Sequence, residues 1–242
     1  TRRSRFTGFD PADVRVLLIE HGDRALATFP ESLSARAEAA LRRLGVTPML
    51  GQSVIDVEPT AVITDRERIP ARTTVWAAGV VASPLAETLA AETGAEIDRG
   101  GRITVEPDLS LPGRPEIFAI GDMARVGDTV YPGVSPVAMQ QGRHVAKQIR
   151  TGRRRPFRYC DKGNVATIGR AAAVVDLRGL KISGFPAWVF WLALHIYYLV
   201  GFGNRLLVMA RWAGAYFARA RGARLITEDD VRVAPERQLV TR

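Results

Sequence analysis

This sequence predicts an α/β fold followed by an α+β region, and three observations support the prediction. Over residues 14–58, a continuous apolar strand is followed by an amphipathic helix and by further short strands. A second apolar strand, at residues 117–120, ends on Gly121 and Asp122, and a helix start follows at Ser135. Later in the chain, short strands separated by glycine turns lead into a segment rich in aromatic residues.

The first strand spans residues 14–20, where the run VRVLLIE is largely apolar and closed by an acid, as in buried parallel strands. A helix with Gly45 as its C-terminal stop is predicted over residues 30–44. Its apolar residues recur at helical spacing: Leu33, Ala37, Leu41 and Leu44. The segments GVTPML and SVIDV, at residues 45–50 and 53–57, predict short strands. This βαβ-like order is half of a nucleotide-binding unit.

The middle of the chain contains three more predicted strands. TVWA, at residues 74–77, runs into Gly79, where backbone can approach a ligand without obstruction by a side chain. A turn at Gly100-Gly101 precedes a strand at residues 103–105. The run at residues 117–120 forms the third, and we expect it to be buried up to the Gly-Asp pair that closes it.

The helix after the Gly-Asp pair is predicted to have Ser135 as its N-cap and Pro136 as its first helical residue. Ser is a favoured N-cap, and Pro has no N–H to leave unsatisfied at that position. One helical face is expected to carry Ala138, Gly142, Val145 and Ile149. The start of this helix would offer the positive end of its dipole to an anionic group.

Beyond three consecutive arginines, Arg153 to Arg155, strands are predicted at residues 164–169, 171–177 and 180–183. Residues 182–204 then contain no formal charge. Such a run reaches the roughly 20 residues that span a bilayer. It is poor in uninterrupted aliphatic residues, however, and it is broken by Pro186, His195 and Gly201.

Ten aromatic residues lie between residues 185 and 217, and Trp and Tyr favour the membrane interface. A helix from Asn204, as N-cap, would carry one apolar face, with Arg211 and Arg219 off its centre. That face would consist of Leu206, Met209, Ala213, Tyr216 and Phe217. We expect this helix to lie in the membrane interface as a monotopic attachment. A true span and a dry helical hairpin or oligomer interface are the alternatives.

Composition narrows the classes of function. The 242 residues carry 34 Lys and Arg against 25 Asp and Glu, a net charge of +9 that favours contact with phosphates or anionic lipid head groups. A solvated basic surface is an equally good interpretation, and no nucleic-acid partner is predicted. Cys160 is the only cysteine, so the sequence offers no disulfide, no CxxC pair and no cysteine-based metal site. No metal is expected, and a reducing cytoplasmic compartment fits.

Two acids at strand ends are candidates for cofactor binding. Glu20 could accept hydrogen bonds from an adenosine ribose, although a Glu at a strand end is more often solvated surface. Gly121 would let a ligand lie against the strand end while Asp122 accepts hydrogen bonds from a polyol such as the ribitol of FAD. An Asp that caps the next turn is the alternative. Gln140 lies one turn into the following helix, where it could face a ring, and His195 could contact a lipid-soluble substrate or be a satisfied interfacial histidine.

Five stretches, taken in order, closely resemble the C-terminal half of type II NADH dehydrogenases, the single-subunit NADH:quinone oxidoreductases. They are TVWAAGV, GRITVEPDLSLPGRPEIFAIGDMA, SPVAMQQGRHVA, GNVATIGRAAAV and FPAWVFWLALHIYYLVGFGNRLLVMARWAGAYFARARGARLI. The Gly-Asp motif alone would indicate only the wider FAD-dependent pyridine nucleotide-disulfide oxidoreductase superfamily. The tail from AWVFW to GARLI is much more specific to the type II enzymes.

The resemblance implies an enzyme with a two-dinucleotide-binding-domain flavoprotein fold, present in part. Such an enzyme transfers a hydride from NADH to FAD and two electrons on to a membrane quinone, without proton pumping. By resemblance, Glu20 would bind the NADH ribose, while Gly79, Gly121 and Asp122 would contact FAD. The flavin supplies the reactivity and the protein positions it, so the lack of a catalytic dyad or metal site is expected.

The quinone site is likewise implied by the resemblance. Ala138 and Gln140 would lie under the isoalloxazine ring, with Gln140 at the mouth of the quinone site. Leu192 and His195 would lie near the quinone tunnel, where the C-terminal helices meet the membrane. Gln140 and His195 are therefore the candidate catalytic residues. The expected location is the cytoplasmic face of the bacterial inner membrane, peripheral or monotopic, with membrane lipid as a partner and homodimer formation left open.

Four segments follow from the resemblance. Residues 1–72 would be the C-terminal part of an NADH-binding domain, and residues 73–152 the C-terminal part of a FAD-binding domain. Residues 153–226 would hold the C-terminal strands and the amphipathic membrane-anchoring helices, and residues 227–242 a tail.

Two departures from the family pattern qualify the expectation. Ser135-Pro136 stands where many members carry an Ala-Gln pair, which bears on quinone preference. Both glycine-rich motifs of the family would precede residue 1, so the chain is interpreted as a C-terminal fragment that does not bind FAD tightly alone. The alternatives are another FAD- and NAD(P)H-dependent reductase with a soluble acceptor, or a non-catalytic membrane-binding remnant.

Overall fold

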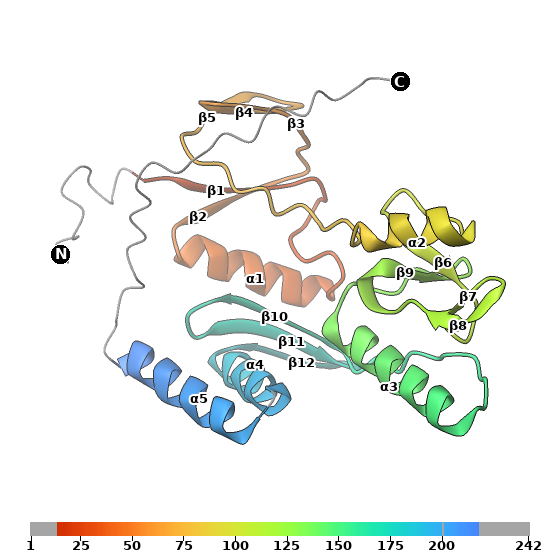
Figure 1. The fold of residues 1–242 in the computed structure, drawn as a ribbon. Helices are drawn as coiled ribbons and strands as arrows, with labels where there is room; N and C mark the ends of the chain where they lie inside the picture. The colour runs from red at the N-terminus through yellow and green to blue at the C-terminus, as the bar shows by residue number, and fades with distance from the viewer. Residues whose placement is uncertain (1–13, 200, 218–242) are drawn as a thin grey trace, which may run out of the picture. The chain divides into compact units, whose positions relative to one another are not determined.

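The computed structural model in Figure 1 describes residues 14–199 and 201–217. The chain divides into two units, one up to Trp188 and one from Val189, and each is described by itself. The predicted tail at residues 227–242, Arg219 and the last residues of the predicted attachment region lie outside the described residues.

The N-terminal βαβ-like prediction is confirmed. Strand β1 (Val16–Glu20) pairs in parallel with β2 (Val46–Leu50), and Glu20 lies opposite Leu50 at the end of the ladder. Helix α1 (Glu31–Arg43) connects them. It buries one stripe, Leu33, Ser34, Ala37 and Ala40, and Gly45 follows its C-cap with a φ of +85°. A left-handed residue after the last turn is what ends many helices, and glycine adopts it without a Cβ penalty.

An antiparallel three-stranded sheet follows in order β3 (Val54–Glu58), β4 (Ala61–Thr64) and β5 (Arg68–Pro70). The predicted strand SVIDV is its first member. The next predicted strand, at residues 74–77, is wrong: these residues form no strand and pair with none in the described chain. An apolar run becomes a strand only where a neighbouring strand accepts its backbone hydrogen bonds, and here Val75 is 82% exposed.

Residues 85–126 build the main core of the molecule. Helix α2 (Leu85–Thr93) packs against β6 (Ile103–Val105), which pairs in parallel with β9 (Ala124–Val126). The hairpin of β7 (Ser110–Leu111) and β8 (Arg114–Phe118) completes it. Nine buried residues form this core: Ala86, Ile103, Val105, Leu109, Leu111, Ala119, Ala124, Val145 and Phe157.

Two details around the Gly-Asp pair differ from the prediction. The strand expected at residues 117–120 is β8, which begins earlier, ends at Phe118 and is exposed at its start. The pair itself lies in a single 3₁₀ turn, η2 (Gly121–Met123), and β9 follows at once instead of a loop. A partner strand that lies elsewhere in the chain, β6, makes a strand of Ala124–Val126, and short-range pattern does not contain that information.

Helix α3 (Ser135–Thr151) forms where predicted, with two corrections. Val134 is the N-cap, so Ser135 is the first helical residue and Pro136 the second, and no side chain caps the helix. The buried face carries Val137, Gln141, Val145 and Gln148, whereas Ile149 is 69% exposed. The hydrophobic pattern predicted the wrong buried face because two of the four buried residues are glutamines. Their side-chain amides hydrogen-bond to backbone groups within the core.

The C-terminal sheet is confirmed. It consists of β10 (Asn164–Gly169), β11 (Ala172–Leu177) and β12 (Leu180–Gly184), joined antiparallel in that order. Leu33 and Ala37 of α1, together with Phe29 two residues before the helix, form a second buried cluster with Val174 of β11. Arg36 also donates a hydrogen bond to the Ser183 hydroxyl over 2.8 Å.

Two helices end the described chain, α4 (Phe185–Tyr198) and α5 (Phe202–Phe217). Asn204 is the third residue of α5 and not its N-cap, because the helix already begins after Gly201. Of the predicted apolar face, Leu206 and Met209 are exposed in this unit. Among the described residues, no helix combines the length and the apolar character needed to cross a membrane.

Candidate functional site

The Gly121-Asp122 turn lies against the start of α3. Gly121 has a φ of +70°, and a Cβ built on it would lie 3.3 Å from the Cβ of Ala138. A left-handed backbone and a close neighbour both favour glycine at this position. The structure therefore brings together Gly121, Asp122 and Ala138, three of the predicted cofactor-binding residues.

Gln141 holds this turn in place. Its Oε1 accepts a hydrogen bond of 2.6 Å from the backbone N–H of Gly121, and its side chain is 1% exposed. Its amide nitrogen Nε2 is also buried, and it has no hydrogen-bond partner among the described residues. Leaving such a donor unpaired costs about 1–3 kcal/mol, so an unpaired amide beside the turn suggests an acceptor that another molecule or segment supplies. The sequence did not single out Gln141, because it reads as a second polar residue next to Gln140.

Asp122 carries an exposed carboxylate that no hydrogen bond engages within the described chain. It lies near Gly133, where an added Cβ would be 3.6 Å from Asp122 Oδ1. Pro136 has no N–H and the N–H of Val137 donates to Val134 O, so few free donors remain at the start of α3. The helix dipole is therefore the main favourable term for an anionic group at this end.

Gln140 is engaged elsewhere. Its Nε2 donates to the backbone oxygen of Cys160 over 3.0 Å, and its Oε1 accepts from the N–H of Cys160 over 2.9 Å. The amide thus joins α3 to the segment that leads into β10. The predicted role of Gln140 at a flavin ring and quinone stays a prediction, and it would have to coexist with this pairing.

Glu20 lies at the carboxyl end of β1, as predicted. One carboxylate oxygen accepts the N–H of Gly22 over 2.8 Å, and His21 Nδ1 lies 2.7 Å from the Ser53 hydroxyl. The N–H of Gln52 donates to the backbone oxygen of Glu20, and Gln52 Oε1 is buried without a partner in the described chain. The end of β1 therefore carries two groups that can accept further hydrogen bonds. One is the Glu20 carboxylate oxygen that does not bind Gly22, and the other is Gln52 Oε1.

Gly79 lies in segment 73–82, which forms no helix or strand, and it has a φ of +114° with no atom within 4 Å of an added Cβ. Four apolar side chains of this segment are strongly exposed: Val75, Trp76, Val80 and Val81. The structure places Gly79 next to no other predicted site residue.

Leu192 and His195 lie on α4 in the second unit. His195 Nδ1 donates to the backbone oxygen of Trp191 over 2.7 Å, because a carbonyl only accepts. The Trp191 ring lies 4.2 Å from the His195 ring and stacks on Trp212 at 6.0 Å. With Nδ1 committed, Nε2 of this exposed histidine is the nitrogen left to contact a substrate.

Metal ligands do not cluster in the described part of the chain: no group of three His, Cys, Asp or Glu side chains lies close enough to hold an ion. The chemistry available at the turn is therefore hydrogen bonding to hydroxyls by Asp122, donation by Gln141, and the α3 dipole.

Comparison with known proteins identifies the family to which the sequence is similar. The family model described as pyridine nucleotide-disulphide oxidoreductase matches residues 8–142, a range that includes Glu20, Gly79 and the Gly121-Asp122 turn. The type II NADH:quinone oxidoreductase Ndh of Mycobacterium tuberculosis is 38% identical over 240 residues, which cover 94% of this chain and 51% of that protein. Its relative NdhA from the same organism is 36% identical, with the same coverage.

A solved structure shares the fold. NDH2 from Plasmodium falciparum in complex with NADH superposes with a TM-score of 0.72 at 15% identity, over 84% of this chain and 58% of that one. At this identity the likeness concerns the fold alone. The chain spans about half the length of the curated relatives it matches.

Proposed function

The chain belongs to the pyridine nucleotide-disulphide oxidoreductase family, and on that premise we propose that its protein is a type II NADH:quinone oxidoreductase. Such an enzyme oxidises NADH and reduces a membrane quinone by two electrons, without pumping protons. The observation that supports this most is the 38% identity to the type II enzyme Ndh across 94% of the chain.

The residues at the Gly121-Asp122 turn fit FAD. The free Asp122 carboxylate would accept hydrogen bonds from ribitol hydroxyls, and the unpaired Nε2 of Gln141 would donate to a flavin oxygen or nitrogen. Gly121 and Ala138 let the turn pack closely against the start of α3, and the α3 dipole would stabilise negative charge on the ring. When bound, FAD supplies the ability to accept a hydride and release two electrons.

The end of β1 fits the NADH adenosine. Glu20 would accept from the ribose hydroxyls through the carboxylate oxygen that Gly22 does not use, and its charge would disfavour a 2′-phosphate. Gln52 Oε1, buried beside the same strand end, offers a second acceptor for a hydroxyl donor. NADH would thus meet two hydrogen-bond acceptors here, and the ribose hydroxyls can donate to both.

The second unit would hold the quinone end of the reaction. We propose that Leu192 contacts the quinone and that His195 hydrogen-bonds it or supplies a proton through Nε2. Gln140 is proposed at the mouth of that site. Trp191, Trp212 and the exposed Leu206 and Met209 would attach this unit to membrane lipid as a peripheral or monotopic element, at the cytoplasmic face of the inner membrane.

The exposed apolar residues of α5 suit a second copy of the chain as well as a lipid surface. Flotation with vesicles and light scattering in solution separate the two, because attachment to lipid adds no mass in the absence of vesicles. A homodimer would double the measured mass, and a monomer that floats would leave lipid as the partner.

The test uses the protein with all the residues that its gene encodes. Purified with its flavin, it should oxidise NADH when a soluble quinone analogue is present, and Asp122→Ala should lower bound FAD per chain by at least about tenfold, as the loss of a charge-assisted hydrogen bond predicts. Asp128→Ala, an exposed acid after the same turn, is the matched control and should retain FAD.

The other readings give different results in the same assay. Electron transfer to soluble acceptors without quinone would identify a different reductase, and no NADH oxidation by a folded, flavin-free protein would identify a non-catalytic membrane-binding protein. Full flavin content in the Asp122→Ala variant would overturn the cofactor site proposed here.

A further inference from the structure

The segment that contains helix α3 and the loop after it is strongly basic. Between Asp128 and Asp161 there is no acidic residue. The same stretch contains seven basic residues: Arg143, Lys147, Arg150, Arg153, Arg154, Arg155 and Arg158. This segment therefore carries a charge of +7, and residues 177–227, which also contain no acidic residue, carry another +7. A local excess of this size attracts anions.

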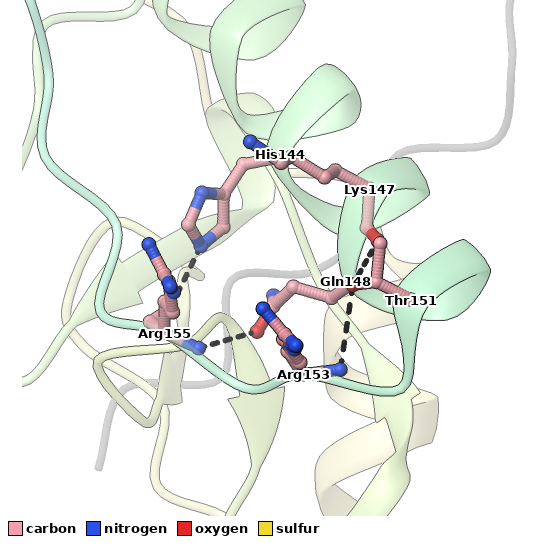
Figure 2. Close-up of a pocket in the computed structure, with 6 residues that line it drawn as sticks. All are labelled: His144, Lys147, Gln148, Thr151, Arg153 and Arg155. Carbon is pink, nitrogen blue, oxygen red and sulfur yellow. Dashed lines mark hydrogen bonds between the residues drawn. The ribbon is translucent and has the colours of Figure 1, made fainter.

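Part of this charge surrounds a pocket of about 200 Å³ at the C-terminal end of α3 (Figure 2). Its lining comes entirely from the last turns of the helix and the loop that follows: His144, Lys147, Gln148, Thr151, Arg153 and Arg155. Three of the six are cationic, and none is acidic. Pockets for drug-sized ligands measure about 300–1,000 Å³, so this one suits a smaller group.

The backbone of the loop is attached to the helix by hydrogen bonds. His144 Nε2 donates to Arg155 O over 2.8 Å, and the N–H of Arg155 donates to Gln148 Oε1 over 3.0 Å (Figure 2). Gln148 is itself 4% exposed and donates from Nε2 to Asp108 O over 2.8 Å. The wall of the pocket is therefore fixed by hydrogen bonds that use amide, imidazole and backbone groups, not by the cationic heads.

The three cationic side chains of the pocket form no ion pair with a carboxylate of the described chain. Arg154, which lies between two of them, is engaged: it forms an ion pair of 3.4 Å with Asp108, bonds Pro115 O and lies over the Phe118 ring. No ion pair of this kind joins Lys147, Arg153 or Arg155 to a described carboxylate. Like charges held around one pocket repel, and a bound anion would relieve that repulsion.

The helix end works against an anion, but weakly. The C-terminus of a helix carries about −0.5 of an elementary charge, whereas the three side chains carry +3 together. Arg150 lies in the last turn, where its charge offsets the dipole. The net field in the pocket is therefore positive.

We propose that this pocket binds a phosphate group. Guanidinium groups match the geometry of phosphate oxygens, several cations converge on one small volume, and the wall is preorganised. The phosphate could belong to a phospholipid head group or to a soluble phosphate. This site lies apart from the Gly121-Asp122 turn and uses none of its residues, so it stands or falls independently of the proposed function.

Equilibrium dialysis of the 242-residue chain against radiolabelled inorganic phosphate tests the proposal, at constant ionic strength because surface charge is screened by salt. One phosphate should bind per chain. The variant with Lys147→Gln, Arg153→Gln and Arg155→Gln should bind at least about tenfold more weakly, since three charge-assisted contacts are lost.

The matched control removes three charges from the same segment outside the pocket, through Arg143→Gln, Arg150→Gln and Arg158→Gln. It should bind phosphate within about twofold of the unsubstituted chain, since distant exposed charges contribute little. Equal weakening in both variants would overturn the proposal in favour of general charge attraction, and so would the absence of saturable binding. Circular dichroism confirms that each variant is folded.

Flotation identifies the source of the phosphate. Vesicles of phosphatidylcholine alone are compared with vesicles that also contain phosphatidylglycerol. If the pocket takes lipid head groups, the pocket variant should lose the gain in flotation that phosphatidylglycerol gives, while the control variant keeps it. If it takes soluble phosphate, both variants should float like the unsubstituted chain while only the pocket variant fails in dialysis. Either result supports the phosphate site.

Discussion

Two neighbouring stretches of this chain both contain apolar runs in sequence, and they differ in structure. Residues 85–126, with Val145 and Phe157, build a core in which Ile103, Leu109 and Leu111 are almost fully buried. Residues 73–82 carry Val75 and Trp76 at 82% and 65% exposure and form no strand. The difference lies in partners: β6 has β9 beside it, and segment 73–82 has no paired strand within the described chain.

This comparison shows that an apolar run favours burial but does not by itself determine a conformation. Where the chain supplies a second strand and a covering helix, the apolar residues are buried against them. Where it does not, the residues remain available to another segment, a ligand or a second molecule. Four substitutions, taken from the largest expected effect to the smallest, test how sharp this contrast is.

Leu111→Ala should destabilise the chain most, by about 2–5 kcal/mol, because it leaves a cavity in the main core. Urea unfolding followed by circular dichroism measures the loss. Leu111→Met, which conserves volume, should cost less than about 1.5 kcal/mol. Equal effects of the two substitutions would mean that this core is loosely packed.

Gly121→Ala should cost about 1–2 kcal/mol for the left-handed backbone, with a further loss from the contact with Ala138. Gly127→Ala is the matched control, because Gly127 also has a positive φ but no atom within 4 Å of the added Cβ. The same unfolding assay compares them. If Gly127→Ala were as costly as Gly121→Ala, the contact with Ala138 would contribute nothing to the loss of stability.

Asp108→Asn should reduce the sensitivity of the core to acid. Burial opposes the charge, yet hydrogen bonds from the Ser110 side chain and backbone, together with the nearby Arg154, hold the pKa of Asp108 below its ordinary value. A lowered pKa contributes stability that is present above the unfolded pKa of about 3.9 and is lost as the pH falls through the folded value.

The free energy of unfolding of the unsubstituted chain should therefore fall between about pH 5 and 3. Asp108→Asn should make this loss smaller by roughly 0.5–1.5 kcal/mol, the usual net value of a hydrogen bond. Thermal unfolding at a series of pH values measures both slopes. Parallel slopes would show that Asp108 does not report on acid unfolding.

Trp76→Ala should have the smallest effect, within about 0.5 kcal/mol, because an exposed side chain loses little on truncation. Tryptophan truncation in a core costs about 3–5 kcal/mol instead. A loss above 1 kcal/mol in the 242-residue chain would show that segment 73–82 is packed in solution and would remove the contrast between the two stretches.

Local pattern predicted those parts of the fold whose partners lie close in sequence. The β1–α1–β2 unit and the β10–β12 sheet form as expected, because glycine turns and short connections bring each strand to its neighbour. The parallel pairing of β6 with β9 joins residues on either side of the β7–β8 hairpin, and it was missed. Residues 74–77 were predicted as a strand from their apolar run alone.

The candidate site shows the same limit. Glycine at position 121 and acid at 122 are visible in sequence, because conformational freedom and charge are properties of single residues. The contribution of Gln141 is not, since its bond to the Gly121 N–H depends on how α3 packs. The buried face of α3 was displaced for this reason: a glutamine that satisfies a backbone group inside the core reads as a surface residue.

Side chains of α3 also act on the chain that follows it. Gln140, His144 and Gln148 are spaced four residues apart, and each bonds backbone groups of Arg155 or Cys160. These three side chains attach the segment through hydrogen bonds to its backbone N–H and C=O groups. The side chains of Arg153, Arg155 and Arg158 take no part in this attachment, so substitutions at these three positions should leave the fold intact. Phe157, which is buried in the main core, Arg154, which is paired with Asp108, and Cys160→Pro, which would remove the N–H that Gln140 binds, are exceptions. The basic character of the segment is therefore free to be selected for binding.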